Sequence, residues 1–99
     1  MRFGVNTLLF ISPFTGESVK FLELIGNMGF DGVEITLEHT GDFDCKKVSK
    51  ALGDIGLGCC SLCGLFTGDR DLRGSSAQQE TAKDYLKAVS YTHLTLPTN

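Results

Sequence analysis

Residues 32–38 read Gly-Val-Glu-Ile-Thr-Leu-Glu, and this stretch decides the fold class. Successive residues of a strand point to opposite faces, so Val33, Ile35 and Leu37 form an apolar face and Glu34 lies on a polar one. A central strand of an open doubly wound sheet is covered on both faces and should be apolar throughout. A polar second face that ends in carboxylates favours a barrel whose interior becomes a site at the carboxyl ends of the strands.

Strand and helix patterns alternate three times along the chain. Residues 3–7, 33–38 and 57–63 are predicted strands, and each is followed by a segment with apolar residues at helical spacing. The predicted buried helix faces are Phe21, Leu24, Ile25 and Met28; Val48, Ala51, Leu52 and Ile55; and Ala82, Tyr85, Leu86 and Val89. This alternation predicts a parallel sheet with right-handed crossovers.

The predicted helices have recognisable end signals. Thr15 and Asp44 are expected N-caps of the first two helices, and Gly56 is expected to end the second. Ser76 and Gln79 have the spacing of a capping box, which predicts the start of the third helix.

Residues 89–98 read Val-Ser-Tyr-Thr-His-Leu-Thr-Leu-Pro-Thr and contain no Lys, Arg, Asp or Glu. They resemble one translated frame of a transposon-type sequencing adapter, and they begin inside the third predicted helix. We therefore expect the genuine chain to be residues 1–88 and residues 89–99 to be a non-native, adapter-derived tail. The alternative is a natural strand or tail.

Charge and hydropathy exclude several classes of protein. The chain of 99 residues has 9 Lys plus Arg against 12 Asp plus Glu, a net charge of −3. Without a basic cluster we expect no nucleic-acid partner. The longest apolar run, residues 8–11, is far shorter than the ~20 residues of a membrane helix, and there is no signal-peptide pattern. No Gly-rich phosphate loop follows the first strand, which disfavours Rossmann and P-loop folds.

The spacing of the four cysteines predicts free thiols rather than a disulfide or a zinc site. Cys60 and Cys63 have C-x-x-C spacing, but in an extended strand they would lie about 10 Å apart on opposite faces. A disulfide needs Cα atoms within about 7 Å, and no further Cys or His pair completes a zinc set. We expect buried, inert thiols and a cytoplasmic protein.

Four segments carry a family resemblance. They are residues 3–7 (Phe-Gly-Val-Asn-Thr), 12–14 (Ser-Pro-Phe), 28–35 (Met-Gly-Phe-Asp-Gly-Val-Glu-Ile) and 69–72 (Asp-Arg-Asp-Leu). The first three resemble the N-terminus of the sugar phosphate isomerase/epimerase superfamily, which has the xylose-isomerase-like TIM barrel. The fourth is similar to the ketose 3-epimerases of the D-tagatose or D-psicose type. The resemblance covers residues 2–88 and implies an N-terminal βαβαβα portion, about three of the eight units of a TIM barrel.

The resemblance implies an isomerase that epimerises C3 of a free ketose through a cis-enediolate, with a divalent metal, Mn or Co. Family members bind the metal through two Glu, one Asp and one His on later strands. We therefore expect no catalytic or metal-binding residue in this chain, an inactive fragment, and a homo-oligomeric parent. The alternatives are a hydroxypyruvate isomerase-like or inosose dehydratase-like enzyme, or a small non-catalytic α/β binding module.

Two predicted site residues lie on the first two strands. Asn6 ends the first strand, where the family position helps to line the sugar pocket; it contacts sugar hydroxyls or caps the strand end by a hydrogen bond. Glu34 matches a superfamily glutamate and should point into the barrel. A buried carboxylate needs a partner, so Glu34 is either a structural anchor or an indirect support of the site.

The remaining predicted site residues follow the third strand. Leu62 and Gly64 lie where relatives approach the substrate; Gly64 lets the backbone come close or is a plain turn glycine. Arg70 and Asp71 lie in the loop over the barrel mouth. They shape a lid, or they form a solvated ion pair that contributes less than ~1 kcal/mol.

Overall fold

Three parallel strands form the sheet of the computed structural model, which describes residues 1–96. The strands are β1 (Gly4–Asn6), β2 (Gly32–Leu37) and β3 (Gly58–Gly64), and their order in the sheet is β1-β2-β3. Gly4 pairs with Gly32, and at the other end Leu37 pairs with Gly64. The mixed α/β architecture with a parallel sheet is therefore confirmed.

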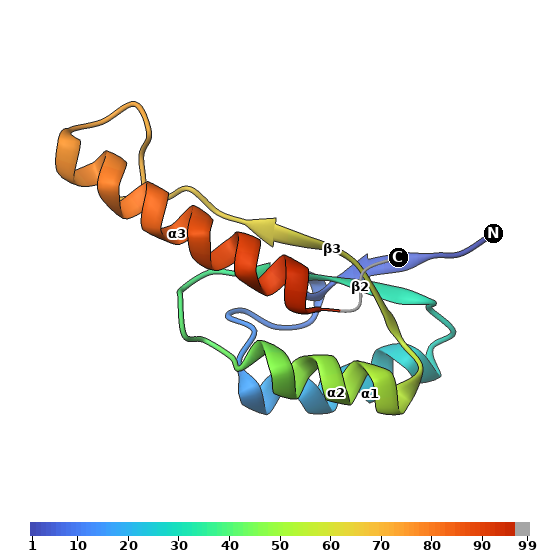
Figure 1. The fold of residues 1–99 in the computed structure, drawn as a ribbon. Helices are drawn as coiled ribbons and strands as arrows, with labels where there is room; N and C mark the ends of the chain where they lie inside the picture. Colours follow the sequence, from blue (N-terminus) through green and yellow to red (C-terminus); the bar gives the residue numbers. More distant parts are fainter. Residues whose placement is uncertain (97–99) are drawn as a thin grey trace.

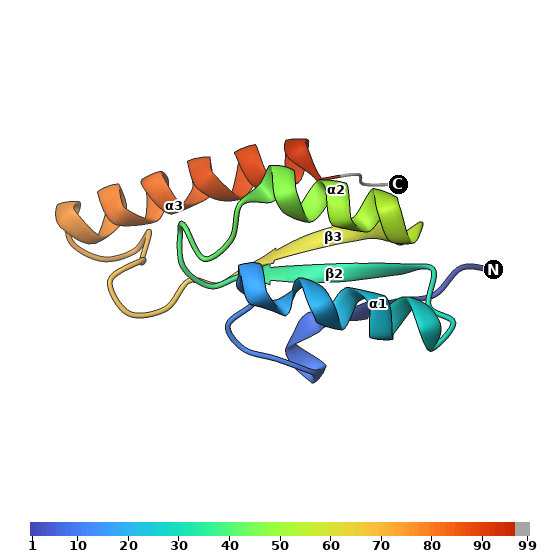
Figure 2. The ribbon, with the colours of Figure 1, turned by 90° about the horizontal axis from the view of Figure 1, so that it is seen from below.

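The helices follow one another along one side of the sheet (Figures 1 and 2). They are α1 (Val19–Asn27), α2 (Cys45–Ile55) and α3 (Ser76–Thr95), with short 3₁₀ turns at Thr7–Leu9 and Gly16–Ser18. α1 contacts α2, α2 contacts α3, and α3 packs against β3. Within residues 1–96 no helix covers the other face of the sheet (Figures 1 and 2).

Two of the predicted caps are confirmed in α2. The side chain of Asp44 accepts hydrogen bonds from the backbone N–H groups of Lys46 and Lys47, at 2.9 and 3.3 Å. Gly56 ends the helix with φ at +80°, the left-handed conformation in which glycine is favoured. Thr15 precedes the 3₁₀ turn that leads into α1, so the helix proper begins later than expected.

The capping box of α3 was predicted one residue too late. Ser75 is the N-cap: its hydroxyl accepts from the backbone N–H of Gln78 at 3.2 Å, and the Gln78 side chain accepts from the N–H of Ser75 at 2.8 Å. Ser76 is already helical. Two adjacent serines are followed three residues later by two adjacent glutamines, so both registers of the box fit the sequence.

The core lies between the sheet and the helices. Val33, Ile35 and Leu37 of β2 and Val48 and Leu52 of α2 are buried, as the alternation and the helical spacing predicted. β2 is thus apolar toward the helices. The predicted α2 face is confirmed at Val48 and Leu52, while Ala51 and Ile55 are half-buried.

The predicted inner face of α1 is confirmed at Ile25 and wrong at Leu24 and Met28. Leu22 is fully buried, together with Ile25, whereas Leu24 is 46% exposed and Met28 is 52% exposed. Both sets of apolar residues have helical spacing, so periodicity could not choose between them. Tertiary packing decides between them, because Leu22 and Ile25 join the core cluster with residues of β2 and α2.

α3 passes through the predicted boundary at Ala88 without interruption and ends at Thr95. Ala82 and Tyr85 are buried as predicted, but Leu86 is exposed. Leu96 lies in the core cluster. The native or adapter origin of residues 89–99 stays a prediction, and residues 97–99 lie outside the described residues.

A bulge in β3 changes which side chains share a face. Val33 pairs with Cys59 and Glu34 with Ser61, so Cys60 is an extra residue. A Cβ on Gly4 would lie 2.5 Å from Cys60 Sγ, which places this thiol over Gly4 on the same face as Glu34. Cys63 pairs with Thr36 on that face too. The prediction that Cys60 and Cys63 point to opposite faces is therefore wrong, because the bulge shifts the alternation by one residue.

Candidate functional site

The uncovered face of the sheet carries a hydrogen-bonded cluster, here called the Glu34 network: Asn6, Glu34, Thr36 and Ser61. The side-chain amide of Asn6 donates to Glu34 Oε1 at 2.6 Å, and the Ser61 hydroxyl donates to Glu34 Oε2 at 2.5 Å. The strands on either side of β2 therefore each supply one donor to the Glu34 carboxylate, and Thr36 of β2 joins the cluster through Asn6. The bulge in β3 is what brings Ser61, rather than Cys60, opposite Glu34.

The electrostatics of the network keep Glu34 ionised. The hydrogen bond from Ser61, followed by the one from Asn6, lowers the pKa of Glu34, while partial burial opposes them. An ionised carboxylate only accepts hydrogen bonds, and each of its oxygens has two lone pairs. Glu34 can therefore hold Asn6 and Ser61 and still accept a further donor.

Both the oxygen and the nitrogen of the Asn6 side-chain amide form hydrogen bonds. Its Oδ1 accepts from the backbone N–H of Leu8 at 2.7 Å and from the Thr36 hydroxyl at 3.2 Å, while its Nδ2 donates to Glu34. The side chain therefore caps the end of β1, one of the two roles considered for it. One N–H of the amide is left for a ligand.

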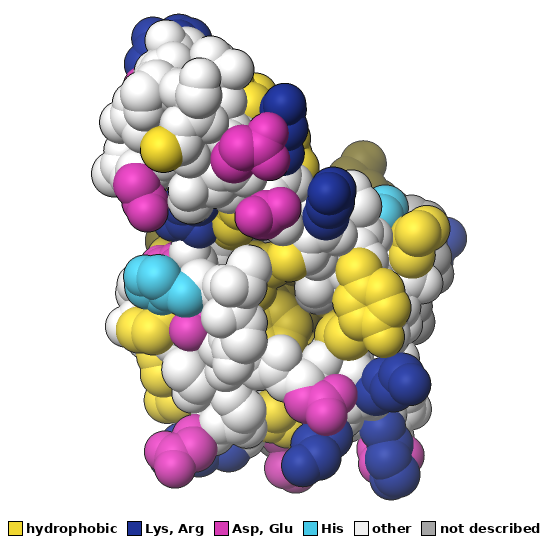
Figure 3. Space-filling view, turned by 60° about the vertical axis from the view of Figure 1, so that its left-hand side comes forward, with side chains coloured by type: hydrophobic (Ala, Val, Ile, Leu, Met, Phe, Trp, Pro, Cys, Tyr) yellow, Lys and Arg dark blue, Asp and Glu magenta, His cyan; other side chains and the backbone are white. Residues whose placement is uncertain are grey.

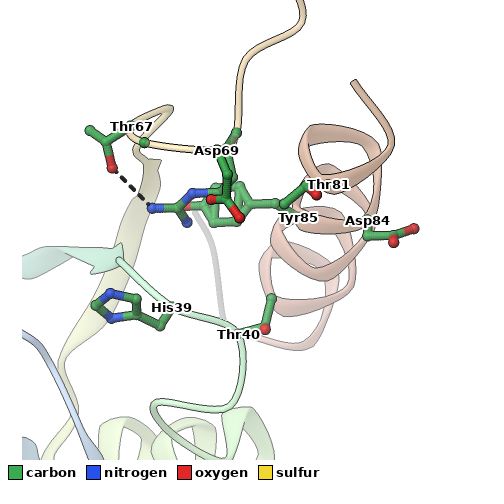
Figure 4. A pocket seen from close by; sticks show the side chains of 9 residues that line it. His39, Thr40, Thr67, Asp69, Thr81, Asp84 and Tyr85 are labelled. Carbon is green, nitrogen blue, oxygen red and sulfur yellow. Dashed lines mark hydrogen bonds between the residues drawn. The ribbon is translucent and has the colours of Figure 1, made fainter. Parts of the chain in front are cut away.

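Arg70 holds the loop between β3 and α3 (residues 65–75) against the carboxyl end of β2. Its Nη1 donates to the backbone carbonyl of Glu38 at 2.6 Å, and its Nη2 donates to the Thr67 hydroxyl at 3.3 Å (Figure 4). Its guanidinium lies over the ring of Tyr85, 4.0 Å from the centroid. These contacts give Arg70 the geometry of a loop anchor.

Asp71 does not pair with Arg70 as one of the predictions had it. Its carboxylate accepts from the backbone N–H of Arg73 at 2.8 Å and from Arg73 Nε at 3.3 Å. The backbone hydrogen bond, followed by the side-chain one, lowers the pKa of Asp71. Asp71 thus shapes the loop locally, while Arg70 ties it to the sheet.

The two other predicted site residues lie outside the Glu34 network. Leu62 pairs with Ile35 and packs against the core, on the helix side of the sheet. Gly64 ends β3, and a Cβ there would meet the Tyr85 hydroxyl oxygen at 3.5 Å, an ordinary contact. The described contacts of Gly64 therefore do not require a glycine.

Tyr85 was predicted only as an apolar member of α3, and its polar role was missed. The residue is 2% exposed. Its hydroxyl donates to the backbone carbonyl of Leu37 and accepts from the backbone N–H of Leu65. A buried tyrosine usually has such partners, so a tyrosine rather than leucine or phenylalanine on a core-facing helix position was the available signal.

A pocket of about 410 Å³ opens beside this tyrosine (Figure 4). It lies between the loops that follow β2 and β3 and the first half of α3. Its lining consists of His39, Thr40, Thr67, Gly68, Asp69, Arg70, Thr81, Asp84 and Tyr85. No member of the Glu34 network lines it. Acidic and basic side chains are interspersed on the molecular face drawn in Figure 3, so neither sign of charge dominates there.

The cysteine thiols differ in burial, whereas all of them were predicted to be buried. Cys59 is buried, and burial, with a smaller contribution from Cys60, raises its pKa to about 11. Cys60 is exposed, which corrects the prediction that it is buried. The bulge is the physical reason, because it turns Cys60 toward the uncovered face.

We expect thiol reagents to separate these two cysteines. At pH 8 a thiol with a pKa of about 11 has roughly 100-fold less thiolate than one at the ordinary 9.0, and burial blocks access as well. Iodoacetamide labelling followed by peptide mass spectrometry should modify Cys60 early and Cys59 only after unfolding in urea. Cys60→Ser should remove the early modification. Equal rates at Cys59 and Cys60 in the folded chain would contradict the bulged register.

Residues 1–96 contain no group of three or more His, Cys, Asp or Glu side chains that could hold a metal ion. The described residues therefore do not fit the divalent metal that the family resemblance implies, and no chemistry is assigned to a metal here. None of the described helices is long and apolar enough to cross a membrane.

No model of a protein family matches the chain, and no curated protein is significantly similar to it.

Proposed function

We propose that residues 1–88 are the first three strand–helix units of a TIM-barrel sugar isomerase, and that the parent enzyme epimerises C3 of a free ketose. The strand order supports this, because β1, β2 and β3 are neighbours in chain order and their helices lie on one side. In a doubly wound sheet the helices cover both faces. Leu24 and Met28 are exposed on α1. In the full-length parent enzyme, a later part of the chain would pack over them.

The observation that carries the proposal is the Glu34 network on the uncovered face. In a barrel this face is the interior, where polar side chains near the carboxyl ends of strands bind substrate. Glu34 accepts a hydroxyl of the ketose through a free lone pair, and Asn6 offers its remaining N–H. Ser61 holds the carboxylate in place. Leu62 has no part in this site because it packs in the core.

The network binds and orients substrate rather than carrying the proton transfer. Removing a proton next to a carbonyl requires positive charge or preorganised donors where negative charge develops. Asn6 has a single N–H left, the Ser61 hydroxyl already donates to Glu34, and none of the three residues supplies positive charge. We therefore place the reaction centre and any Mn or Co ligands on residues outside the described chain. The four free thiols favour a reducing, cytoplasmic location for the parent.

The test is to sequence the source DNA through the Ala88 codon with long reads and to assay the full reading frame. We expect the frame to continue toward the ~250 residues of a TIM barrel. The purified product, with Mn²⁺, should convert D-fructose or D-tagatose into its C3 epimer, measured by sugar chromatography. Hydroxypyruvate and inosose, run in parallel, test the related activities. A genuine stop after Asn99 would overturn the proposal and favour a small binding module.

A further inference from the structure

The Tyr85 hydroxyl stands between the carboxyl ends of β2 and β3. Leu37 and Gly64 are the last residues paired across these strands. Beyond this pair, the hydroxyl accepts from the backbone N–H of Leu65 and donates to the backbone carbonyl of Leu37. A side chain from α3 therefore lies where a direct backbone hydrogen bond from Leu65 to Leu37 would extend the ladder.

The two backbone groups held by the hydroxyl are complementary to each other. One is a donor and the other an acceptor, and both belong to neighbouring strand ends. If the hydroxyl leaves, they can pair directly, so neither group loses its partner. This matters because a buried backbone group without a hydrogen bond is costly, and that cost usually blocks such a rearrangement.

The same tyrosine also holds the loop after β3. Arg70 stacks on the Tyr85 ring, and Phe66 contacts it edge-on with ring centroids 5.7 Å apart. The backbone N–H of Arg70 is bonded within the loop to the carbonyl of Thr67 at 3.1 Å. Withdrawal of Tyr85 removes the platform on which Arg70 and Phe66 rest, and with it one wall of the 410 Å³ pocket.

We propose that Tyr85 is a removable wedge with two arrangements. With the wedge in, the strand ends are held apart, residues 65–75 are anchored and the pocket is present. With the wedge out, Leu65 bonds directly to Leu37, the ladder is longer by one hydrogen bond, and residues 66–74 leave the edge of the sheet. The device depends only on the described contacts and not on the identity of the substrate.

Amide hydrogen exchange, measured residue by residue by NMR on the whole chain, tests the wedge in Tyr85→Ala. This variant removes both the hydroxyl between the strand ends and the ring on which Arg70 and Phe66 rest. We expect the Arg70 amide to exchange at least about tenfold faster, while the Leu65 amide stays within about threefold of the parent chain. Tyr91→Ala is the matched control, because Tyr91 lies on the same helix and is 56% exposed; it should change neither amide.

Two results would overturn the proposal. If Leu65 exchanges as fast as Arg70 in Tyr85→Ala, the hydroxyl is only a structural bridge and the ladder does not close. If neither amide changes, the loop does not depend on the wedge. Should Tyr85→Ala not fold, exchange of the unmodified chain in low urea replaces it. There the Arg70 amide should open before the Leu65 amide, and identical urea dependence of the two would refute the second arrangement.

Discussion

Leu22→Ala is expected to lower the free energy of unfolding by about 2–5 kcal/mol, the usual range for truncating a buried leucine. Leu22 is fully buried in α1 between the sheet and α2, so the truncation loses apolar burial and leaves a cavity. The same substitution two residues later, Leu24→Ala, should cost less than about 1 kcal/mol, because Leu24 is 46% exposed.

Urea unfolding followed by circular dichroism at 222 nm measures both variants in one experiment. The pair is well matched, since both leucines lie in the same helix and lose the same atoms. A larger loss for Leu24→Ala than for Leu22→Ala would show that the helix is rotated toward the face that periodicity alone predicted.

Glu34→Ala is expected to cost about 1–3 kcal/mol at pH 7, because it removes the acceptor of both Asn6 and Ser61. Glu34→Gln keeps the shape and removes the charge, and so isolates the part of the effect that depends on pH. The pKa of Glu34 in the folded chain lies below its ordinary value of 4.5. The ionised carboxylate therefore stabilises the fold fully above that value, and this contribution is lost as the pH falls through the lowered pKa.

Unfolding curves of the parent chain and Glu34→Gln between pH 7 and pH 3 check this prediction. The unsubstituted chain should have a higher free energy of unfolding than Glu34→Gln. This difference should be constant near neutral pH and shrink below pH 4.5. Ser61→Ala, which removes the largest cause of the lowered pKa, should make the pH-dependent loss smaller and complete at a higher pH, because the folded-state pKa moves back toward 4.5. If the difference in free energy of unfolding between the two chains is the same at pH 7 and pH 3, Glu34 is not held by these hydrogen bonds.

Patterns within a single strand or helix were sufficient to predict β2 and α2. The alternation in β2 placed Val33 and Ile35 correctly, and the spacing and caps of α2 identified its buried face and its last turn. These signals suffice because each is read from one element, whose two faces differ clearly in polarity.

The remaining features depend on contacts between distant segments. The bulge at Cys60 leaves no mark in the sequence of β3, yet it decides that Ser61 meets Glu34. Arg70 and Asp71 are neighbours in sequence, but Arg70 bonds to Glu38, which no local pattern indicates. Sequence patterns placed Asn6 and Glu34 on the strands that meet, whereas their contacts with Thr36 and Ser61 became visible only from the strand pairing.

The bulge also affects how this chain is aligned with other parallel α/β proteins. A residue-by-residue alignment anchored at Cys59 would match a regular third strand to Cys60 at the position facing Glu34, and it would transfer the role of that position to a thiol. The structural equivalent is Ser61, one residue further on. Any alignment through β3 therefore needs a one-residue gap at Cys60 before functional residues are compared.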